Sequence, residues 1–444
     1  MTSPREPVLV AGGGWAGLSA AATLAQQGVP VRLVEAARQL GGRARRVRLG
    51  DFAVDNGQHL LIGAYRETLA LMQQVGVTLN DRFLRTPLHL ESWQDRRRVL
   101  RLRAPRLPEP FHLLVALLHA RGLSLRDRWR ALRFGAFIQR RRGELADDCT
   151  VAELLHGHGQ TAATVRMLWE PLCLATLNTP VAEASAQIFV RVLYEALFRF
   201  HGDSDLLFAH GDLGTLLPDP ALDYIESRGG TVQLGKRVTA LHVDDARLRG
   251  VELDGEPVPA TRLILAVSPE QCLALCRPHA ALATLAHDLA QLDYQPICTV
   301  YLQYSPDTRL PRPAIGIVGG LCQWLFDRRH AGEAGRMAAV ISADGPHMDM
   351  DNAELIAAVR EEIARVRPHW PAPRDARVIR EKRATFACRA GIATLRPAAA
   401  TPVAGLYLAG DYTDTGYPAT LEGAVRSGRL AARQILETQQ EEPT

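Results

Sequence analysis

"VLVAGGGWAGLSAAATLA", residues 8–25, joins two apolar runs through a cluster of glycines. The glycines interrupt the unbroken apolar core that a secretion signal needs, so a signal peptide is disfavoured. A second β-branched run, "GVPVRLVE" at 28–35, follows and ends in an acidic residue. The pattern predicts a strand, a glycine turn, a helix and a second strand.

The glycines of this turn have the spacing of a dinucleotide-binding loop. Gly12, Gly14 and Gly17 form G-x-G-x-x-G. In such a loop the first glycine permits a sharp turn, the second lets the backbone approach a pyrophosphate, and the third lets the helix pack on the strand. Glu35 follows where a carboxylate would bind ribose hydroxyls, and an acid there disfavours the 2′-phosphate of NADP. A plain packing turn between strand and helix is the alternative.

Length and cysteine content set the broad class. A chain of 444 residues is long enough for two domains with substantial cores. The seven cysteines are scattered and odd in number, which predicts reduced thiols in a cytoplasmic protein. Cys272 and Cys276 have the spacing of a metal pair on a helix, but no second pair or histidine cluster accompanies them. We therefore predict buried thiols and no metal site.

The positive charge is concentrated in one segment. Between Arg82 and Arg142 there are sixteen arginines and four acidic residues, while the net charge of the chain is +4. Apolar runs at 111–118 and 129–138 give this segment the character of basic amphipathic helices. A solvated face is one interpretation, and peripheral contact with an anionic membrane surface, the inner membrane, is the other. Binding of nucleic acid is disfavoured because few aromatic residues are interleaved.

Two further stretches extend the first signal. "EAARQLGGRARR" at 35–46 places Arg43 after a glycine pair, which suits a second backbone approach to a phosphate with a guanidinium as counter-charge. "DNGQHLLIG" at 55–63 has the small and amide residues that suit the border of a cofactor ring, with His59 as a donor. A turn that carries a surface histidine is the alternative for the second stretch.

Two later segments read as a continuation of the nucleotide-binding domain. "VTALHVDDARLRGVELDG" at 238–255 predicts a hairpin, with Asp244, Asp245 and Gly250 near its turn. "RLILAVSP" at 262–269 predicts a buried strand. A long insertion separates both from the first βαβ unit.

The strongest late signal lies at residues 405–436. An apolar strand ends at Gly410 and Asp411, a turn of small residues follows, and a helix is predicted from about Leu421. Small residues in its first turn let a ring or a pyrophosphate approach the positive end of the helix. One cofactor is thus held by both chain ends, which a long FAD molecule requires and NAD does not. We predict tight, noncovalent FAD.

These signals predict an α/β protein made of two domains. A Rossmann-like FAD-binding domain is expected from residues 1–85, 205–270 and 395–444. An inserted α+β substrate domain is expected from residues 86–204, mainly helical, and 271–394.

The quoted segments resemble the amine-oxidase and carotenoid-desaturase superfamily of flavoproteins. "LAGDYTDTGYPATLEGAVRSG" at 408–428 is similar to the ending of plant-type phytoene desaturases. "DNGQHLLIGAY" at 55–65, "PICTVYLQY" at 296–304 and "CQWLFDRR" at 322–329 look like the bacterial hydroxysqualene dehydroxylases. That resemblance implies removal of an allylic hydroxyl from hydroxysqualene, a prenyl-derived lipid, to give squalene for hopanoid synthesis.

The resemblance also implies roles for single residues. The implied FAD contacts are Gly12, Gly14, Gly17, Glu35, Arg43, Val238, Gly410 and Asp411, with Val238 acting through its backbone on adenine. Amine oxidases of the superfamily usually place a lysine beside the flavin in a strand corresponding to 295–304. No lysine occurs there, which counts against amine oxidation. The candidates for a proton donor are His59, Tyr417 and Glu170.

Two other functions remain open on the sequence alone. A carotenoid-type desaturase would transfer hydride in the opposite direction, from substrate to oxidised flavin, and the motifs do not distinguish the two directions. A lipid carrier of the Rab-escort type would have a similar fold and no working flavin site. The FAD contacts predicted at both chain ends argue against a carrier.

Overall fold

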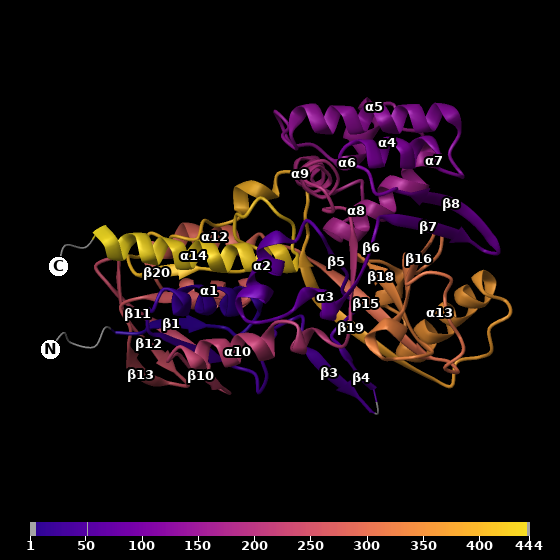
Figure 1. The fold of residues 1–444 in the computed structure, drawn as a ribbon. Coiled ribbons are helices and arrows are strands. Elements are labelled where there is room, and N and C mark those ends of the chain that lie inside the picture. Colours follow the sequence, from indigo (N-terminus) through magenta and orange to yellow (C-terminus); the bar gives the residue numbers. More distant parts are fainter. Residues whose placement is uncertain (1–5, 51, 442–444) are drawn as a thin grey trace.

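A parallel sheet forms one end of the molecule (Figure 1). The computed structural model describes residues 6–50 and 52–441. The sheet has five strands in the order β10-β2-β1-β14-β20, and every neighbouring pair is parallel. The strands are β1 (Val8–Ala11), β2 (Val31–Glu35), β10 (Thr231–Leu234), β14 (Leu263–Leu265) and β20 (Leu406–Leu408). This confirms the predicted Rossmann-like sheet, built from segments far apart in the sequence.

Two helices from opposite ends of the chain lie side by side beside this sheet (Figure 1). They are α1 (Trp15–Gln26) and α14 (Leu421–Glu441). A Cβ on Gly428 would lie 2.1 Å from the carbonyl oxygen of Ala16, so the two helices touch backbone to backbone. The hydroxyl of Ser19 donates to the carbonyl of Val425 at 2.8 Å across the same contact. The alanine-rich sequence of α1 permits this close packing.

A small antiparallel sheet contains the predicted hairpin. Its strands are β11 (Val238–Asp244), β12 (Arg247–Leu253) and β13 (Glu256–Pro259). Asp245 lies in the turn with positive φ, as expected near that position. Gly250 does not lie near the turn, which corrects the prediction. It lies inside β12, where a Cβ would come within 2.8 Å of the carbonyl oxygen of Val258 on the neighbouring strand.

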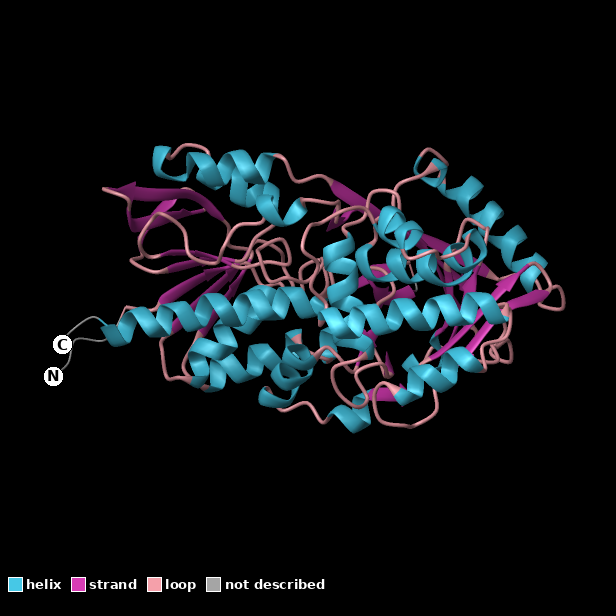
Figure 2. Ribbon diagram, turned by 90° about the horizontal axis from the view of Figure 1, so that it is seen from above, coloured by secondary structure: helices cyan, strands magenta, loops and turns pink. Residues whose placement is uncertain are grey.

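The second large sheet is mixed and lies at the opposite end of the molecule (Figures 1 and 2). It contains strands from both of the predicted insertions, in the order β19-β15-β18-β17-β16-β7-β8. The strands are β7 (His89–Gln94), β8 (Arg97–Arg103), β15 (Tyr294–Gln303), β16 (Ala314–Ile317), β17 (Trp324–Asp327), β18 (Arg336–Ser342) and β19 (Asp375–Phe386). Helix α13 (Asn352–Val366) packs against β19.

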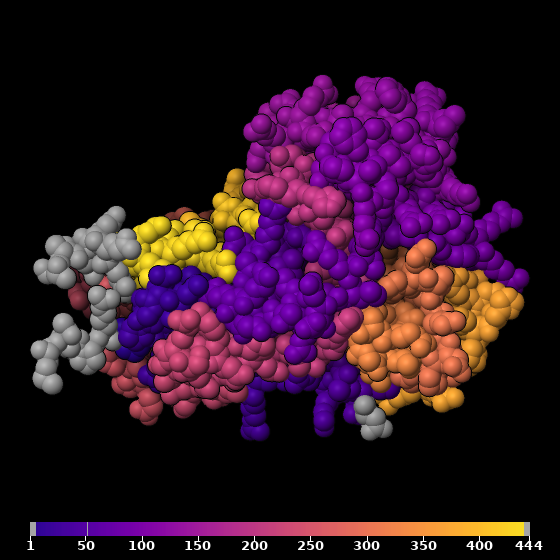
Figure 3. Space-filling view, viewed as in Figure 1, coloured from indigo at the N-terminus to yellow at the C-terminus, as the bar shows by residue number. Residues whose placement is uncertain are grey.

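A lobe of helices rises above the mixed sheet (Figures 1 and 3). Its elements are α4 (Phe111–Leu118), α5 (Leu125–Arg141), α6 (Val151–Gly157), α7 (Ala162–Thr164), the π-helical segment η1 (Val165–Trp169), α8 (Glu170–Leu177) and α9 (Ala186–Leu197). In Figure 1, α5 runs along the outer edge of the lobe and α4 lies directly beneath it. The hydroxyl of Ser124 caps α5 by accepting from the N–H of Asp127.

The remaining elements connect these parts. They are β3 (Arg46–Leu49), β4 (Phe52–Asp55), β5 (Leu61–Ile62), β6 (Phe83–Thr86), β9 (Leu206–Ala209), α2 (Arg66–Gln74), α3 (Leu79–Arg82), α10 (Pro218–Ser227), α11 (Pro269–Cys276) and α12 (Ala283–Ala290). In the part of the chain that the structure describes, no helix is long and apolar enough to cross a membrane.

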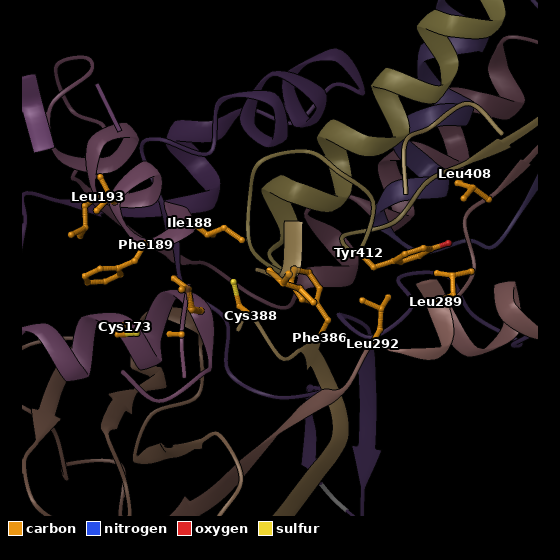
Figure 4. Close-up of a cluster of buried hydrophobic side chains, with 14 of the residues drawn as sticks. Cys173, Ile188, Phe189, Leu193, Leu289, Leu292, Phe386, Cys388, Leu408 and Tyr412 are labelled. Atoms are coloured by element: carbon orange, nitrogen blue, oxygen red, sulfur yellow. The ribbon is translucent and has the colours of Figure 1, made fainter. Parts of the chain in front are cut away.

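One hydrophobic core continues from the helical lobe to the parallel sheet. Figure 4 shows Phe189 of α9 and Cys173 of α8 at one end of this cluster, with Leu408 of β20 at the other. Helices α11 and α12, expected in the substrate domain, contribute to the same core, and α11 also packs against β11. The division into two domains at the stated residues therefore stays a prediction.

Candidate functional site

The glycine loop between β1 and α1 combines two close contacts with one open position. Gly12 has φ +110°, and a Cβ there would lie 2.3 Å from the carbonyl oxygen of Ala266. A Cβ on Gly17 would lie 1.8 Å from the carbonyl oxygen of Gly12, so Gly17 lets the helix pack on the loop. Gly14 has an extended backbone, and the nearest atom to its Cβ is the Cα of Gly42 at 3.8 Å. The open space beside Gly14 lies at the N-terminus of α1, where free N–H groups favour a phosphate.

The carboxylate of Glu35 is held in place at the end of β2. Its Oε2 accepts from the backbone N–H of Gly13 at 2.6 Å, and its Oε1 accepts from that of Ala37 at 2.7 Å. Each carboxylate oxygen has a second lone pair that remains free to accept a hydroxyl. This orientation suits the binding of two ribose hydroxyls.

A second glycine segment lies against the first. Gly41 and Gly42 both have positive φ, and the N–H of Gly41 donates to the carbonyl of Gly13 at 2.9 Å. A Cβ on Gly42 would lie 3.1 Å from the Cα of Gly14. Both segments line one cavity, so the backbone can approach a ligand there from two sides.

Arg43 and Asp411 join the two ends of the chain at this cavity. Arg43 Nη2 donates to Asp411 Oδ1 at 2.5 Å, and Arg43 Nη1 donates to the carbonyl of Ala384 in β19 at 2.7 Å. The Asp411 side chain is buried, whereas the Arg43 side chain is 40% exposed. The guanidinium therefore already has an anionic partner, and its role as a counter-charge to phosphate stays a prediction.

The loop after β20 is fixed by a buried arginine. Arg396 donates to three carbonyls of this loop, those of Asp411, Tyr412 and Thr413. The helix that follows begins at Leu421, as the sequence predicts, and its first turn lines the cavity. Glu422 of this turn is fully buried and accepts from the N–H groups of Glu67 and Thr68 at the start of α2.

A single cavity of about 1650 Å³ contacts all of these segments. Pockets for one drug-sized ligand are typically about 300–1000 Å³, so this cavity has room for a dinucleotide and a second ligand. Seven of the eight residues predicted to bind the cofactor line it: Gly12, Gly14, Glu35, Arg43, Val238, Gly410 and Asp411. Gly17 does not line it and acts through the packing described above. The open position at Gly14, the oriented carboxylate and the helix end together fit a bound dinucleotide.

A second arm of the same cavity extends beneath the helical lobe. Apolar side chains from α4, α5, α8, α9 and the mixed sheet line it, among them Leu117, Leu132, Leu172, Leu193, Phe326 and Val340. No lysine lies in β15, and the cavity-lining Lys236 is at the nucleotide end beside Val238. The second arm therefore suits a long, uncharged, apolar ligand.

The loop Asn56–His59 lines the cavity and connects its two arms, because it bonds to Arg43 of the nucleotide-binding segment and to Thr299 of the mixed sheet. We call this part of the cavity the junction. His59 Nδ1 is 3.1 Å from the carbonyl oxygen of Gly57. Because that oxygen can only accept, Nδ1 carries the proton. Burial lowers the pKa of His59 to about 4, so the ring is neutral near pH 7 and its Nε2 is an acceptor. The sequence suggested His59 as a donor; in this tautomer its Nε2 is an acceptor toward the cavity, so the donor role stays a prediction.

The other two donor candidates are placed differently. Tyr417 lines the cavity and is 7% exposed, and its hydroxyl lies beside the Glu195 carboxylate without a hydrogen bond of standard geometry. Burial raises the pKa of Tyr417, and the Arg426 guanidinium, 4.2 Å from the ring centroid, opposes this. Glu170 begins α8 and does not line the cavity, although Trp169 before it does. Glu195, which the sequence did not single out, lines the cavity and raises the pKa of Tyr417 further.

The cysteine pair is buried, as predicted. The Sγ atoms of Cys272 and Cys276 are 3.9 Å apart in α11 and both residues are fully shielded. Among the described residues, no group of three or more histidine, cysteine or acidic side chains is arranged to hold a metal ion.

Comparison with known proteins assigns the chain to a family. The sequence model described as "Flavin containing amine oxidoreductase" matches residues 15–436. The chain is 30% identical to a hydroxysqualene dehydroxylase of Rhodopseudomonas palustris, over 97% of this chain and 98% of that protein. It is 28% identical to a hydroxysqualene dehydroxylase of Zymomonas mobilis, over 95% of this chain and 97% of that protein. A 15-cis-phytoene desaturase of an Oncidium hybrid is 25% identical over 98% of this chain and 78% of that protein.

Solved structures share the fold at low sequence identity. Cyclohexylamine oxidase from Brevibacterium oxydans superimposes with a TM-score of 0.71 at 17% identity, over 98% of this chain and all of that chain. Putrescine oxidase bound to putrescine superimposes with a TM-score of 0.70 at 16% identity, over 97% of this chain and 99% of that chain. These two similarities concern the fold alone.

Proposed function

The chain belongs to the family of flavin-containing amine oxidoreductases, and we propose that it removes the allylic hydroxyl of hydroxysqualene to form squalene. It is an FAD-dependent oxidoreductase, which argues against the alternative of a lipid carrier without a flavin site. Relatives named hydroxysqualene dehydroxylase, similar over almost the whole chain, support the proposed substrate.

The observation that carries this proposal is the apolar arm of the cavity. It continues from the nucleotide-binding segments to the helical lobe, and its lining is dominated by aliphatic and aromatic side chains. Burial of a hydrocarbon chain contributes about 0.8 kcal/mol per CH₂, so a thirty-carbon lipid needs few polar contacts for affinity. The hydroxyl of Tyr417, which lines the cavity, suits a ligand with a single hydroxyl.

The reaction requires a proton and a hydride at the same allylic centre. The carbon–oxygen bond breaks, the hydroxyl takes up a proton and leaves as water, and a carbon–hydrogen bond forms at the allylic system. Reduced flavin, when bound, supplies the two electrons and the hydrogen. The chain's own groups exclude water from the apolar arm, hold the substrate chain and deliver the proton.

Tyr417 is our proposal for the proton donor. Tyr417 lines the cavity and its hydroxyl makes no hydrogen bond of standard geometry, whereas Nδ1 of His59 donates its proton to the carbonyl of Gly57 and Glu170 does not line the cavity. Arg426 over the ring stabilises negative charge that develops on Tyr417 as the proton leaves. Hydrogen bonds of catalytic groups commonly tighten when the substrate is bound.

An anaerobic single turnover tests the proposed reaction. Chemically reduced protein is mixed with hydroxysqualene without oxygen, the flavin spectrum is followed, and the products are extracted. We expect reoxidation of the flavin coupled to one equivalent of squalene. If oxidised protein instead loses its flavin colour on addition of a more saturated prenyl chain and yields a new double bond, the desaturase alternative is correct.

We also propose that the protein docks on an anionic membrane through α4 and the start of α5. Helix α4 buries Leu113, Ala116 and Leu117 on one face and exposes apolar side chains on the other. Six of the nine exposed large apolar side chains among the described residues lie in this region: Leu107, Phe111, Leu114, Leu118, Leu125 and Trp129. We call these six residues the α4–α5 apolar face. Such a cluster is unusual on a surface that meets only water.

Two observations favour a lipid bilayer as the partner of this face. The α4–α5 apolar face lies within the basic segment, and Arg106, Arg126 and Arg133 beside it are exposed. Cations around an apolar patch suit anionic lipid headgroups around an acyl interior. Leu114 and Trp129 are both exposed and cavity-lining, so the cavity opens at this face. A substrate dissolved in the bilayer would then enter without crossing water.

Flotation with liposomes tests this docking. We expect binding to anionic liposomes at low salt that declines as salt screens the arginines. The triple variant Phe111→Ser, Leu118→Ser and Trp129→Ser should bind at least about tenfold more weakly, because each buried apolar side chain contributes about 1.5–3 kcal/mol.

The matched control removes exposed apolar side chains elsewhere. Leu234→Ser with Leu430→Ser should float like the unchanged protein, because both positions lie outside the α4–α5 apolar face. Absence of binding at low salt, or equal loss in both variants, would contradict the docking proposal and favour a solvated basic face.

A further inference from the structure

Three segments that carry the family resemblance meet at one buried place. They are residues 55–65, 296–304 and 322–329. The hydroxyl of Tyr301 in β15 donates to the carbonyl of Asp55 at 3.0 Å. The N–H of Gln58 is 3.4 Å from the hydroxyl oxygen of Thr299, also in β15. The mixed sheet thus holds the loop Asn56–His59, which lines the cavity, through Tyr301 and Thr299, which do not line it.

Arg328, which begins the short helix η4 (Arg328–Ala331), makes the strongest of these connections. It is 3% exposed. Its Nε and Nη2 donate to the two carboxylate oxygens of Glu333 at 3.0 and 2.6 Å. Its Nη1 donates to Gln58 Oε1 at 2.7 Å, and its Nη2 is 3.8 Å from Asp55 Oδ2. One edge of the guanidinium is therefore anchored to its own loop, and the other edge holds the cavity loop.

Gln58 transmits this restraint to the main chain of the cavity loop. While its Oε1 accepts from Arg328, its Nε2 donates to the carbonyl of His59 at 2.8 Å. A displacement of the guanidinium would therefore move the backbone at Gln58 and His59. The same loop is held at its other end by Asn56, whose side chain donates to the carbonyl of Arg43 and to Glu381 of β19.

We propose that Arg328 is a positioning residue that, through Gln58, fixes the loop Asn56–His59 against the ring of the bound flavin. The inference rests on FAD bound in this cavity with its ring at the junction, and it does not depend on hydroxysqualene as the substrate. A planar guanidinium suits this role because it bonds in two directions at once, which an ammonium group at the same place does not do.

The test compares Arg328→Lys, Gln58→Leu and the double variant, each as the FAD-loaded protein without substrate. Lysine keeps a positive charge beside Glu333 but lacks the second nitrogen of the guanidinium, which donates to Gln58. Leucine at position 58 removes the connection and leaves the Arg328–Glu333 pair intact, so this variant decides the question if Arg328→Lys does not fold. The measurements are flavin content, the visible circular dichroism of bound flavin, and its midpoint potential.

We expect normal flavin content with an altered visible spectrum in both single variants. The equilibrium between reduced and oxidised flavin should change about fivefold to tenfold, the size of the effect of one typical protein hydrogen bond. A tenfold change corresponds to about 30 mV for two electrons. The double variant should change no more than either single variant, because both remove the same connection.

Arg329→Gln is the matched control. Arg329 is the exposed neighbour of Arg328 and donates to the carbonyls of Pro306 and Thr308, away from the cavity loop. Its substitution should leave the spectrum and the potential unchanged. Unchanged spectra in the Arg328 and Gln58 variants, additive changes in the double variant, or the same change in the control would each overturn the proposal. None of these results depends on product formation, so they are separate from a failure of the proposed reaction.

Discussion

Replacement of Gly14 by valine is expected to give a folded protein that purifies almost without flavin. Gly14 has an extended backbone that a β-branched residue adopts readily, and its Cβ would meet no protein atom closer than 3.8 Å. The side chain would instead fill the cavity at the N-terminus of α1, where the cofactor phosphates are proposed to bind. Loss of two charge-assisted hydrogen bonds, each worth about 1.5–3 kcal/mol, weakens binding at least about a hundredfold.

The measurement is the ratio of flavin to protein after purification, with far-UV circular dichroism as the check on folding. Gly157→Val is the control, because Gly157 is exposed in α6 and a Cβ there would also meet open space. That variant should keep full flavin content. A Gly14→Val protein with full flavin content would show that the loop does not hold the phosphates.

Replacement of Tyr417 by phenylalanine is expected to slow the single-turnover reaction by about 10²–10⁴-fold, the contribution typical of a positioned general acid. The ring and its contact with Arg426 remain, so only the hydroxyl is lost. Flavin content should not change, and substrate affinity should change little because burial of the hydrocarbon chain supplies most of it. The rate of flavin reoxidation by hydroxysqualene is the quantity to measure.

Tyr412→Phe is the control for this prediction. Tyr412 lies in the same loop, its buried hydroxyl lies beside Cys272, and it does not line the cavity. Its loss should leave the rate unchanged. A Tyr417→Phe protein that reacts at the normal rate would assign the proton to another group, with the carboxyl of Glu195 beside it as the next to test.

The cofactor-binding part could be predicted because backbone geometry is encoded locally. Gly12 and Gly17 must be glycine because a Cβ at either position would clash with the backbone. The sequence shows this requirement as the spacing of its glycines. The start of the last helix at Leu421 was visible for a similar reason, since small residues mark a helix end that must be approached closely. These sequence patterns can be recognised without knowing which distant segments pack against them.

The junction could not be predicted, because its contacts join residues far apart in the sequence. Gln58 and Arg328 are 270 positions apart, and each by itself is typical of a solvated surface. The donor role expected for His59 stays a prediction, because the state of its ring depends on burial and on the carbonyl of Gly57, neither of which the sequence specifies. Whether Glu170 faces the cavity depended on the orientation of α8, which the sequence does not specify.

The position of β20 and α14 has a consequence for synthesis of the protein. Strand β20 pairs with β14, and α14 covers α1, yet both are made after every other element of the described fold. Until residues 406–441 have left the ribosome, one edge of the parallel sheet is unpaired and the backbone contact between Gly428 and Ala16 is missing. Such long-range parallel pairing is slow to form and exposes the nascent chain to aggregation. The dinucleotide site is therefore completed only once residues 406–441 have been made, and a chain that stalls before them leaves this edge of the sheet unpaired.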